Sequence, residues 1–415
     1  MSMTQTRYAM PRYMQQFQCI GSACEDTCCA WWGIGVDKRT YDRYRGIADQ
    51  SERERILSQL ELKPGGHAKD YAAFKMNPGT GGCSMLSGGL CTIQARHGEH
   101  YLSGTCSTYP RKVNEQAGTV EISAQLSCPE AARLALLQED ACRMTAASEV
   151  QTPNLVIAST PAGSGTDANQ PAYHYRAIRD AAIRVLQNRR YHFPHRLILL
   201  GLLCEQLELL IQEQVSRDIP AFLASFEEEL EGGLANNEEL QQYAAFPRDT
   251  EYQIRILNQY LMRKLESTIW NLRYKACVAD YMKGMTGQGD QTEQIVRQYD
   301  AAYAAYLQPF TEQHAYFFEN YAVNAVFGSF LAGLHQGIGI YEQYKTLVID
   351  YAMIKLHMIG LAAHRGELSA ESAVELVQCY TKNYEHAASY RRDLLRELAA
   401  DGRDTLNGMV LLITN

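Results

Sequence analysis

Cysteine is the residue type whose distribution along this chain points to chemistry. The chain has 415 residues and 12 cysteines, and eight of the cysteines lie within the first 128 residues. These eight are Cys19, Cys24, Cys28, Cys29, Cys83, Cys91, Cys106 and Cys128. Closely spaced thiolates can converge on one centre, and such sets bind zinc or iron–sulfur clusters. The sequence therefore predicts a thiolate-rich metal centre, with all eight cysteines as candidate ligands.

The number of cysteines exceeds what one centre needs, because one zinc ion or one [4Fe–4S] cluster takes four. Either some of the eight are structural thiols, which pack as small apolar groups, or a second metal is bound. Cys28 and Cys29 are adjacent, and adjacent side chains diverge in both helices and strands. We expect one of these two to bind the main centre and the other to face the core or a second site.

The spacing of the cysteines matches none of the common metal motifs. No Cys-x₂-Cys pair is present, so neither the usual zinc pattern nor the ferredoxin pattern applies. Cys24 and Cys28 begin a Cys-x₃-Cys-x₂-Cys arrangement, but its third position is Trp31. Spacing alone therefore predicts a metal and leaves zinc and iron–sulfur open.

Composition excludes several classes of protein. The chain has 39 Lys and Arg against 47 Asp and Glu, a formal net charge of −8, which argues against nucleic acid or an anionic membrane as a partner. The longest apolar run, Leu197–Cys204, is far shorter than the roughly 20 residues of a membrane span. The first residues contain no apolar segment of the kind a signal peptide needs. We expect a cytoplasmic protein whose thiols are reduced rather than paired in disulfides.

Two different patterns divide the chain. Residues 1–143 are rich in Cys, Gly and turn signals, with short strands expected near 89–93 and 119–123 and helices over 38–60 and 129–137. Residues 144–171 are small, polar and interrupted by Pro and Gly, as a linker is. From 172 to 415, apolar residues recur at spacings of three and four. The predicted fold is mainly α: a Cys-rich metal-binding α+β module followed by a helical C-terminal domain.

Within the helical part the sequence predicts helices through 178–186 and 197–210, where apolar residues recur at spacings of three and four, and five further helical segments. Glycines or short polar stretches separate several of them. The segments are 250–282, 292–307, 315–334, 340–364 and 369–398.

Several motifs resemble those of the flagellin lysine-N-methylase (FliB) family. Residues 17–29 (FQCIGSACEDTCC) resemble the opening of that family, and Cys83, Cys91 and residues 106–111 (CSTYPR) fit its cysteine-cluster domain. Residues 127–136 (SCPEAARLAL) also match. In the helical part, residues 318–324 (FENYAVN) resemble the family's Glu-Asn-Tyr-x-Val-Asn segment. The resemblance thus covers both parts of the chain.

The resemblance implies a cytoplasmic enzyme that transfers methyl groups from S-adenosylmethionine to lysine ε-amines of flagellin. It also implies an iron–sulfur cluster, expected as [4Fe–4S], held by the cysteines, with zinc as the alternative. A Rossmann-type methyltransferase fold is not expected. Its Gly-rich turn should follow a strand, but Gly163–Gly165 lies in the expected linker and Gly337–Gly339 in the helical part.

Methyl transfer to lysine requires the neutral amine, whereas free lysine has a pKa of about 10.4. We expect Glu319 to orient or deprotonate the amine and Tyr321 to line the lysine channel. Asn320 and Asn324 are the candidates for donor contacts, since residues four apart share a helix face. In the alternative, Tyr321 belongs to the core and Glu319 pairs with a neighbouring helix.

Two other functions remain open from the residues alone. One is a non-enzymatic metal-binding or redox module joined to a helical protein-interaction domain, which the missing Rossmann signature favours. The other is an enzyme of the same architecture that acts on lysines of a different protein.

Overall fold

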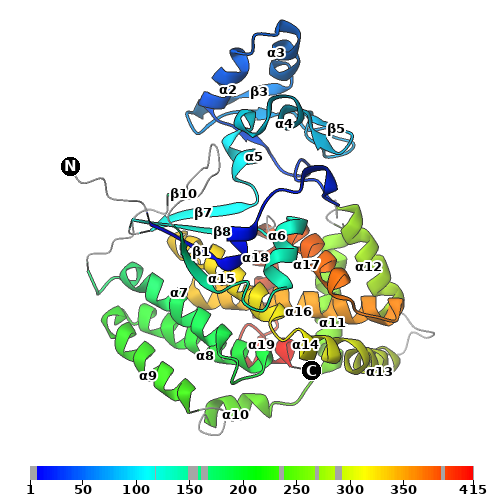
Figure 1. Cartoon of the computed structure of the whole chain (residues 1–415). Helices are drawn as coiled ribbons and strands as arrows, with labels where there is room; N and C mark the ends of the chain where they lie inside the picture. The colour runs from blue at the N-terminus through cyan, green and yellow to red at the C-terminus, as the bar shows by residue number, and fades with distance from the viewer. Residues whose placement is uncertain are drawn as a thin grey trace. The chain divides into compact units, whose positions relative to one another are not determined.

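The structure is a computed structural model (Figure 1), which describes residues 7–116, 118–147, 158–159, 167–232, 238–266, 271–285, 292–384 and 388–414. Contacts divide the chain into two compact units. Unit 1 contains residues 1–131 and 144–159, and unit 2 contains residues 132–143 and 160–415. Each unit has a hydrophobic core of its own.

A five-stranded sheet in unit 1 has the order β10-β7-β8-β1-β9. Its centre is an antiparallel hairpin in which Arg111 pairs with Ala124, and Gly118, at φ +75°, makes the turn that L-residues avoid. Strand β1 runs parallel to β8 and antiparallel to β9. The strands are β1 (Arg7–Pro11), β7 (Arg111–Gln116), β8 (Thr119–Ala124), β9 (Met144–Ala147) and β10 (Ala158–Ser159).

The rest of unit 1 surrounds a small core that includes Ile34, Val36, Tyr44 and Phe74. Side-chain caps begin two of its helices: Asp37 accepts from Thr40 N, and Asp49 accepts from Glu52 N. Its strands form two small sheets, β2-β4-β3 and β5-β6. The strands are β2 (Gly35–Val36), β3 (Leu60–His67), β4 (Asp70–Phe74), β5 (Leu86–Ser87) and β6 (Leu90–Cys91). The helices are α1 (Arg12–Gln16), α2 (Lys38–Arg45), α3 (Gln50–Leu57), α4 (Thr92–His97) and α5 (Gly104–Thr108), and α6 (Pro129–Leu136) crosses into unit 2.

Unit 2 is built of helices throughout its described residues. Pro171 and Pro194 stand in the first turns of α7 and α8, where a missing N–H costs nothing. The first helices are α7 (Pro171–Gln187), α8 (Phe193–Gln212), α9 (Ile219–Glu231), α10 (Glu238–Ala244), α11 (Thr250–Glu266) and α12 (Leu272–Met285). Then come α13 (Thr292–Ala302), α14 (Gln308–Gln313), α15 (Phe317–His335), α16 (Ile340–Arg365), α17 (Ala370–Tyr384), α18 (Ala388–Ala400) and α19 (Leu406–Ile413).

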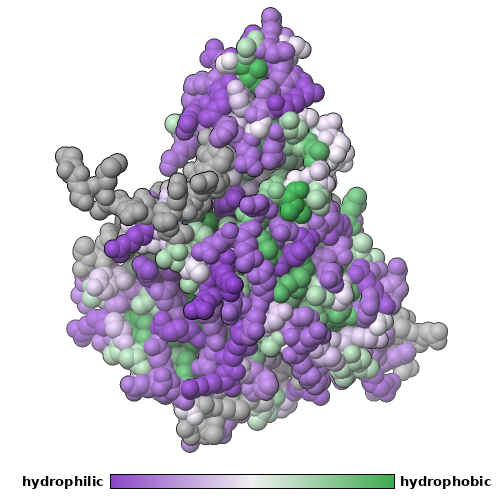
Figure 2. Space-filling model, in the orientation of Figure 1, coloured by the Kyte–Doolittle hydropathy of each residue, from purple (hydrophilic) through white to green (hydrophobic). Residues whose placement is uncertain are grey.

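Helix α16 forms the centre of unit 2. It packs against α8, α12, α13, α15, α17 and α19. By length and composition it could cross a membrane, but 89% of its apolar window is buried inside the protein, as in a core helix. The face shown in Figure 2 is mainly hydrophilic, with apolar residues in small separate patches.

The predicted fold class is confirmed: a small α+β part precedes a mostly helical part, and the described residues contain no Rossmann-type sheet. The helix expected over 38–60 is broken at Gly46 into α2 and α3. The segment expected over 250–282 corresponds to α11 and α12, and that over 369–398 to α17 and α18.

The predicted domain limits at residues 143 and 171 differ from the contact-based division, which assigns residues 132–143 to unit 2. Two short parts of the expected linker, β9 and β10, belong to the five-stranded sheet. Residues 148–157 and 160–166 of that linker, with Gly163–Gly165, lie outside the described residues. The linker over 144–171 stays a prediction.

Candidate metal and ligand site

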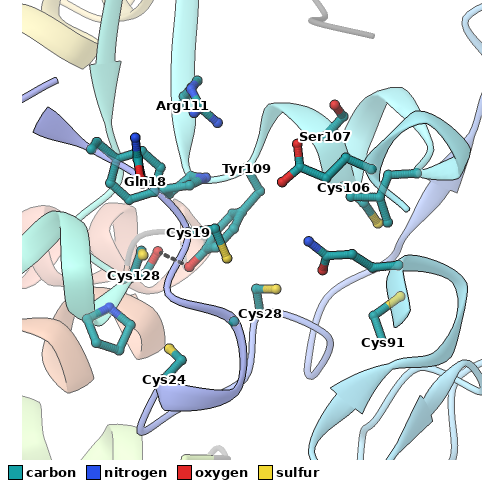
Figure 3. A pocket seen from close by; sticks show the side chains of 18 of the residues that line it. Gln18, Cys19, Cys24, Cys28, Cys91, Cys106, Ser107, Tyr109, Arg111 and Cys128 are labelled. Atoms are coloured by element: carbon teal, nitrogen blue, oxygen red, sulfur yellow. Dashed lines mark hydrogen bonds between the residues drawn. The ribbon is translucent and has the colours of Figure 1, made fainter. Parts of the chain in front are cut away.

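A cavity of about 920 Å³ in unit 1 contains most of the N-terminal cysteines (Figure 3). Seven of the eight line it; Cys83 does not. The lining comes from the loop after α1, from β6, from α5 and its following turn, and from the turn after β8. The fold thus brings together cysteines that lie up to about a hundred residues apart in the sequence.

Four cysteines, namely Cys19, Cys24, Cys28 and Cys128, surround one end of the cavity (Figure 3). A short 3₁₀ turn, Gly21–Ala23, reverses the chain between Cys19 and Cys24, and Cys24 N donates to Gly21 O at 3.1 Å. Burial raises the pKa of Cys24, and the nearby Cys19 and Cys28 raise it further. Burial likewise raises the pKa of Cys128 to about 12, with Cys24 and Cys19 adding to the effect. These thiols are therefore close enough to influence one another's ionisation.

The remaining cysteines lie toward the small core of unit 1. Cys29 and Cys83 are core members, and Cys83 N donates to Cys29 O at 2.7 Å. A hydrogen bond with Cys29 lowers the pKa of Cys91 to about 6, so Cys91 is the more acidic thiol of that pair. Burial raises the pKa of Cys106 to about 12, and the neighbouring Cys91 adds to it.

Cys28 and Cys29 have different surroundings although their sulfurs are 4.0 Å apart. Cys28 is exposed at the cavity, whereas Cys29 is buried in the core. This divergence is the arrangement that backbone geometry predicts for neighbouring side chains. We call the four that surround one end of the cavity the cavity group (Cys19, Cys24, Cys28 and Cys128), and the four that belong to or pack against the small core the core group (Cys29, Cys83, Cys91 and Cys106). Cys29, Cys91 and Cys106 of the core group also line the cavity.

No three His, Cys, Asp or Glu side chains of the described residues surround one point closely enough to hold a single metal ion. Tetrahedral zinc needs four ligand atoms about 2.0–2.3 Å from the ion. The cysteines of a [4Fe–4S] cluster bind four different iron atoms and so stand farther apart. The metal centre and the choice of its ligands stay predictions.

Arg111 is a cavity residue that sequence reasoning did not select. It begins β7, and its guanidinium lies 5.0 Å from the centre of the Phe17 ring. Its guanidinium makes no hydrogen bond or ion pair within the described part of the chain. Burial lowers its pKa, while Glu99, Cys19 and Cys128 act in the opposite direction. The signal was present in the sequence, since Arg111 ends the CSTYPR motif.

Polar and aromatic groups complete the cavity wall. Tyr109 Oη lies 3.1 Å from Ser127 Oγ, and the Trp32 ring lies 5.7 Å from the Tyr109 ring. Trp32 Nε1 donates to Cys28 O at 2.7 Å, which ties the cysteine loop to this aromatic pair. The wall therefore combines thiols, one cation and aromatic faces.

The four residues predicted on α15 are all buried in unit 2. Glu319 accepts hydrogen bonds from Arg189 Nε and Nη2 at 3.0 and 2.9 Å, and from Arg196 Nη1 at 2.6 Å. Asn320 Nδ2 donates to Gln138 O at 2.8 Å. Because two guanidiniums engage the Glu319 carboxylate, the arrangement favours the pairing role over that of a free base.

Tyr321 and Asn324 lie on the same buried helix. The roles predicted for Glu319, Asn320, Tyr321 and Asn324 stay predictions. None of the four lines the cysteine cavity of unit 1.

A second polar cluster in unit 2 centres on His357, which is fully buried. Its Nδ1 lies 2.6 Å from Met353 O and its Nε2 lies 3.3 Å from Tyr274 Oη. Since a carbonyl can only accept, Nδ1 carries the proton and Nε2 accepts from the tyrosine. Burial lowers the pKa of His357 to about 4, so the ring is neutral near pH 7. This cluster is a satisfied part of the core.

Comparison with known protein families assigns the helical part of the chain to a family. A family model described as the FliB lysine N-methylase C-terminal domain matches residues 179–412, more than half of the chain. The chain belongs to the FliB family. This confirms the family resemblance inferred from the motifs, although the FliB match covers helices and does not reach the N-terminal cysteines.

Three curated relatives match parts of the chain. Two are named "Lysine-N-methylase", from Salmonella typhimurium and Salmonella choleraesuis, and each is 31% identical over 142 residues, or 34% of this chain. A third, "Flagellar biosynthetic protein FliU" of Salmonella muenchen, is 33% identical over 132 residues, which are 32% of this chain and 78% of FliU. The match spans only 35% of the length of the two lysine-N-methylases. No solved structure matches the chain.

Proposed function

We propose that this FliB-family chain is an S-adenosylmethionine-dependent protein-lysine N-methyltransferase. The observation that carries the proposal is the family match over residues 179–412, together with two relatives named lysine-N-methylase. The reaction forms a bond between the lysine nitrogen and the methyl carbon, and it breaks the bond between that carbon and the donor sulfur. S-adenosylhomocysteine leaves, and the proton of the lysine ammonium passes to water or to a base.

The proposal includes a [4Fe–4S] cluster held by the cavity group. All twelve cysteines are free thiols, and four of them converge on one end of the cavity. No three metal-binding side chains of the described residues surround a single point, which a cluster accommodates better than zinc does, because each thiolate binds its own iron atom. When bound, the cluster would supply an iron centre that fixes the loop 17–29 against the turn after β8.

The size of the cavity supports a second occupant. Pockets for small ligands measure about 300–1,000 Å³. The cavity of about 920 Å³ is at the upper end of that range. Cysteines line only part of its wall, and the remainder carries Phe17, Trp32, Tyr109 and Arg111. Aromatic faces attract a cationic methylsulfonium, so this wall suits the donor.

Flagellin is the proposed substrate, since FliU is named a flagellar biosynthetic protein and the motifs resemble those of the flagellin lysine-N-methylases. A cytoplasmic location belongs to the same proposal, because free thiols and an iron–sulfur cluster require a reducing compartment.

The test uses the full chain purified without oxygen. We expect bound iron and sulfide, the visible absorption of an iron–sulfur cluster, and methylation of flagellin lysines that depends on S-adenosylmethionine, measured by mass spectrometry. Protein that contains zinc, binds no S-adenosylmethionine and transfers no methyl group would contradict the proposal. That result would favour the non-enzymatic metal module with a helical interaction domain.

A further inference from the structure

Arg111 is a cation at the wall of the cavity, and its guanidinium has no hydrogen-bond or ion-pair partner among the described residues. A guanidinium has five N–H donors in a planar fork. Arg111 is half-buried, and none of these donors has a hydrogen-bond acceptor among the described residues. The Phe17 ring lies against it, with its centre 5.0 Å from the guanidinium carbon. Removing a charge from water costs free energy unless an opposite charge compensates it, so this wall is suited to an anion.

The position of Arg111 is well defined by the sheet. It is the first residue of β7, and its backbone pairs with Ala124 at the end of β8. Figure 3 shows its side chain on the same side of the cavity as Gln18 and Cys19. The planar fork of arginine matches a carboxylate through two parallel hydrogen bonds.

Two acidic side chains, Asp26 and Glu99, line the same cavity. Glu99 lines the cavity and acts electrostatically on Arg111, but the two form no ion pair. A gap between an unpaired cation and a carboxylate fits a zwitterion, whose carboxylate meets the arginine and whose ammonium meets the glutamate. An α-amino-acid group has this charge pattern.

We propose that Arg111 binds the carboxylate of an α-amino-acid group, with Glu99 facing its ammonium, and that this group is the methionine end of S-adenosylmethionine. The inference rests on the proposed function, since it places the methyl donor in the cysteine cavity of unit 1. Arg111 is then a positioning residue for the donor.

A different role for Arg111 makes different predictions. Cys19 and Cys128 are also among its charged neighbours, so its charge could serve only to balance thiolates that hold a metal. In that case its loss lowers the amount of bound iron and weakens all donor analogues equally. In the proposed role its loss weakens only those ligands that carry a carboxylate.

The experiment measures binding by calorimetry to the anaerobically purified full chain. Three ligands are compared: S-adenosylmethionine, S-adenosylhomocysteine and decarboxylated S-adenosylmethionine. The wild-type protein should bind the decarboxylated ligand roughly tenfold more weakly or worse, because it lacks the charge-assisted hydrogen bonds. Arg111→Met should weaken the binding of the two ligands that carry a carboxylate by a similar factor. It should leave the affinity for the decarboxylated ligand unchanged. Arg111→Lys should bind the two carboxylate ligands with affinities between those of the wild-type protein and Arg111→Met.

Lys69→Met is the matched control, because Lys69 is an exposed cation of unit 1 that does not line the cavity. It should leave all three affinities unchanged. Equal weakening of the three ligands by Arg111→Met, or loss of iron with an unchanged affinity ratio, would overturn the assignment while the proposed function stands. Wild-type protein that binds none of the three would overturn both.

Discussion

Arg196 Nη1 donates to Glu319 Oε2 at 2.6 Å, and both side chains are only 3% exposed. Arg189 donates to the same carboxylate from the other side. Glu319 is therefore the shared anion of two arginines that come from α8 and from the segment after α7. The segment that resembles the family motif thus carries a structural ion network in addition to any role in catalysis.

Glu319→Gln is expected to destabilise the fold, since it leaves the buried Arg196 without its counter-charge. Loss of one partner of a buried ion pair costs about 3–5 kcal/mol. The free energy of unfolding from urea denaturation measures this. Glu139→Gln is the matched control, because Glu139 binds Arg189 with 67% of its side chain exposed and should cost about 1 kcal/mol or less. A Glu319→Gln protein of full stability that has lost methyl transfer would instead support the base role.

Lys355 should make stability depend on pH in the alkaline range. Burial lowers its pKa to about 7, and its Nζ donates to Leu412 O and Ile413 O at the end of α19. The folded pKa lies below the unfolded value, so the unfolded chain binds more protons between about pH 7 and 10.5. The contribution of Lys355 to stability therefore rises with pH through this window.

Lys355→Met removes that titration. Urea denaturation should show that the wild-type protein gains stability relative to Lys355→Met between pH 7 and pH 10. Lys275→Met, at an exposed position of α12, is the control and should follow the wild-type curve. Parallel pH curves for the wild type and Lys355→Met would contradict the assignment.

Gly284→Ala is expected to disturb the centre of unit 2. A Cβ at this position of α12 would collide with the carbonyl oxygen of Gly360 in α16. Backbone cannot move aside as a side chain can, and overpacking of this kind costs about 1–3 kcal/mol. Thermal denaturation measures the loss. Lys275→Ala on the same helix serves as the control, and an unchanged melting temperature for Gly284→Ala would show that the two helices can separate freely.

The helical part could be predicted from the sequence because its signal is local. Apolar residues at spacings of three and four mark α7, α8 and α16 directly. Strands β9 and β10 could not be predicted, because they depend on distant partners. Pro11 pairs with Met144 and Asn114 pairs with Ala158, and the short, small-residue strands carry almost no β signal.

The candidate site could be predicted only in part, because residue type and spacing are local features whereas the arrangement of the residues is not. The cysteines are recognisable by type and spacing, but the cavity that collects them is a tertiary feature. The ion pairs of Glu319 could not be predicted either, because its arginine partners lie 123 and 130 residues away in the sequence. That the Arg111 guanidinium has no ion-pair partner among the described residues is likewise visible only once the fold is known.

The division of the cysteines into a cavity group and a core group predicts which of them bind the proposed cluster. Cys19→Ser and Cys128→Ser should each lower the bound iron of anaerobically purified protein, measured by metal analysis and visible absorption, because these thiols belong to the four that surround one end of the cavity. Cys83→Ala should retain iron, since Cys83 lies in the core and does not line the cavity. It should instead lower stability by about 1 kcal/mol, because Met85 N loses its hydrogen bond to the sulfur.

Cys204→Ser provides the control in unit 2, where the thiol is buried among helix residues far along the chain from the cavity group. It should keep the full iron content. Loss of iron in Cys83→Ala with full retention in Cys19→Ser and Cys128→Ser would reverse the assignment and place the cluster among the core cysteines. Because each variant is measured for both iron and unfolding free energy, a protein that has merely unfolded is distinguished from one that has lost a ligand.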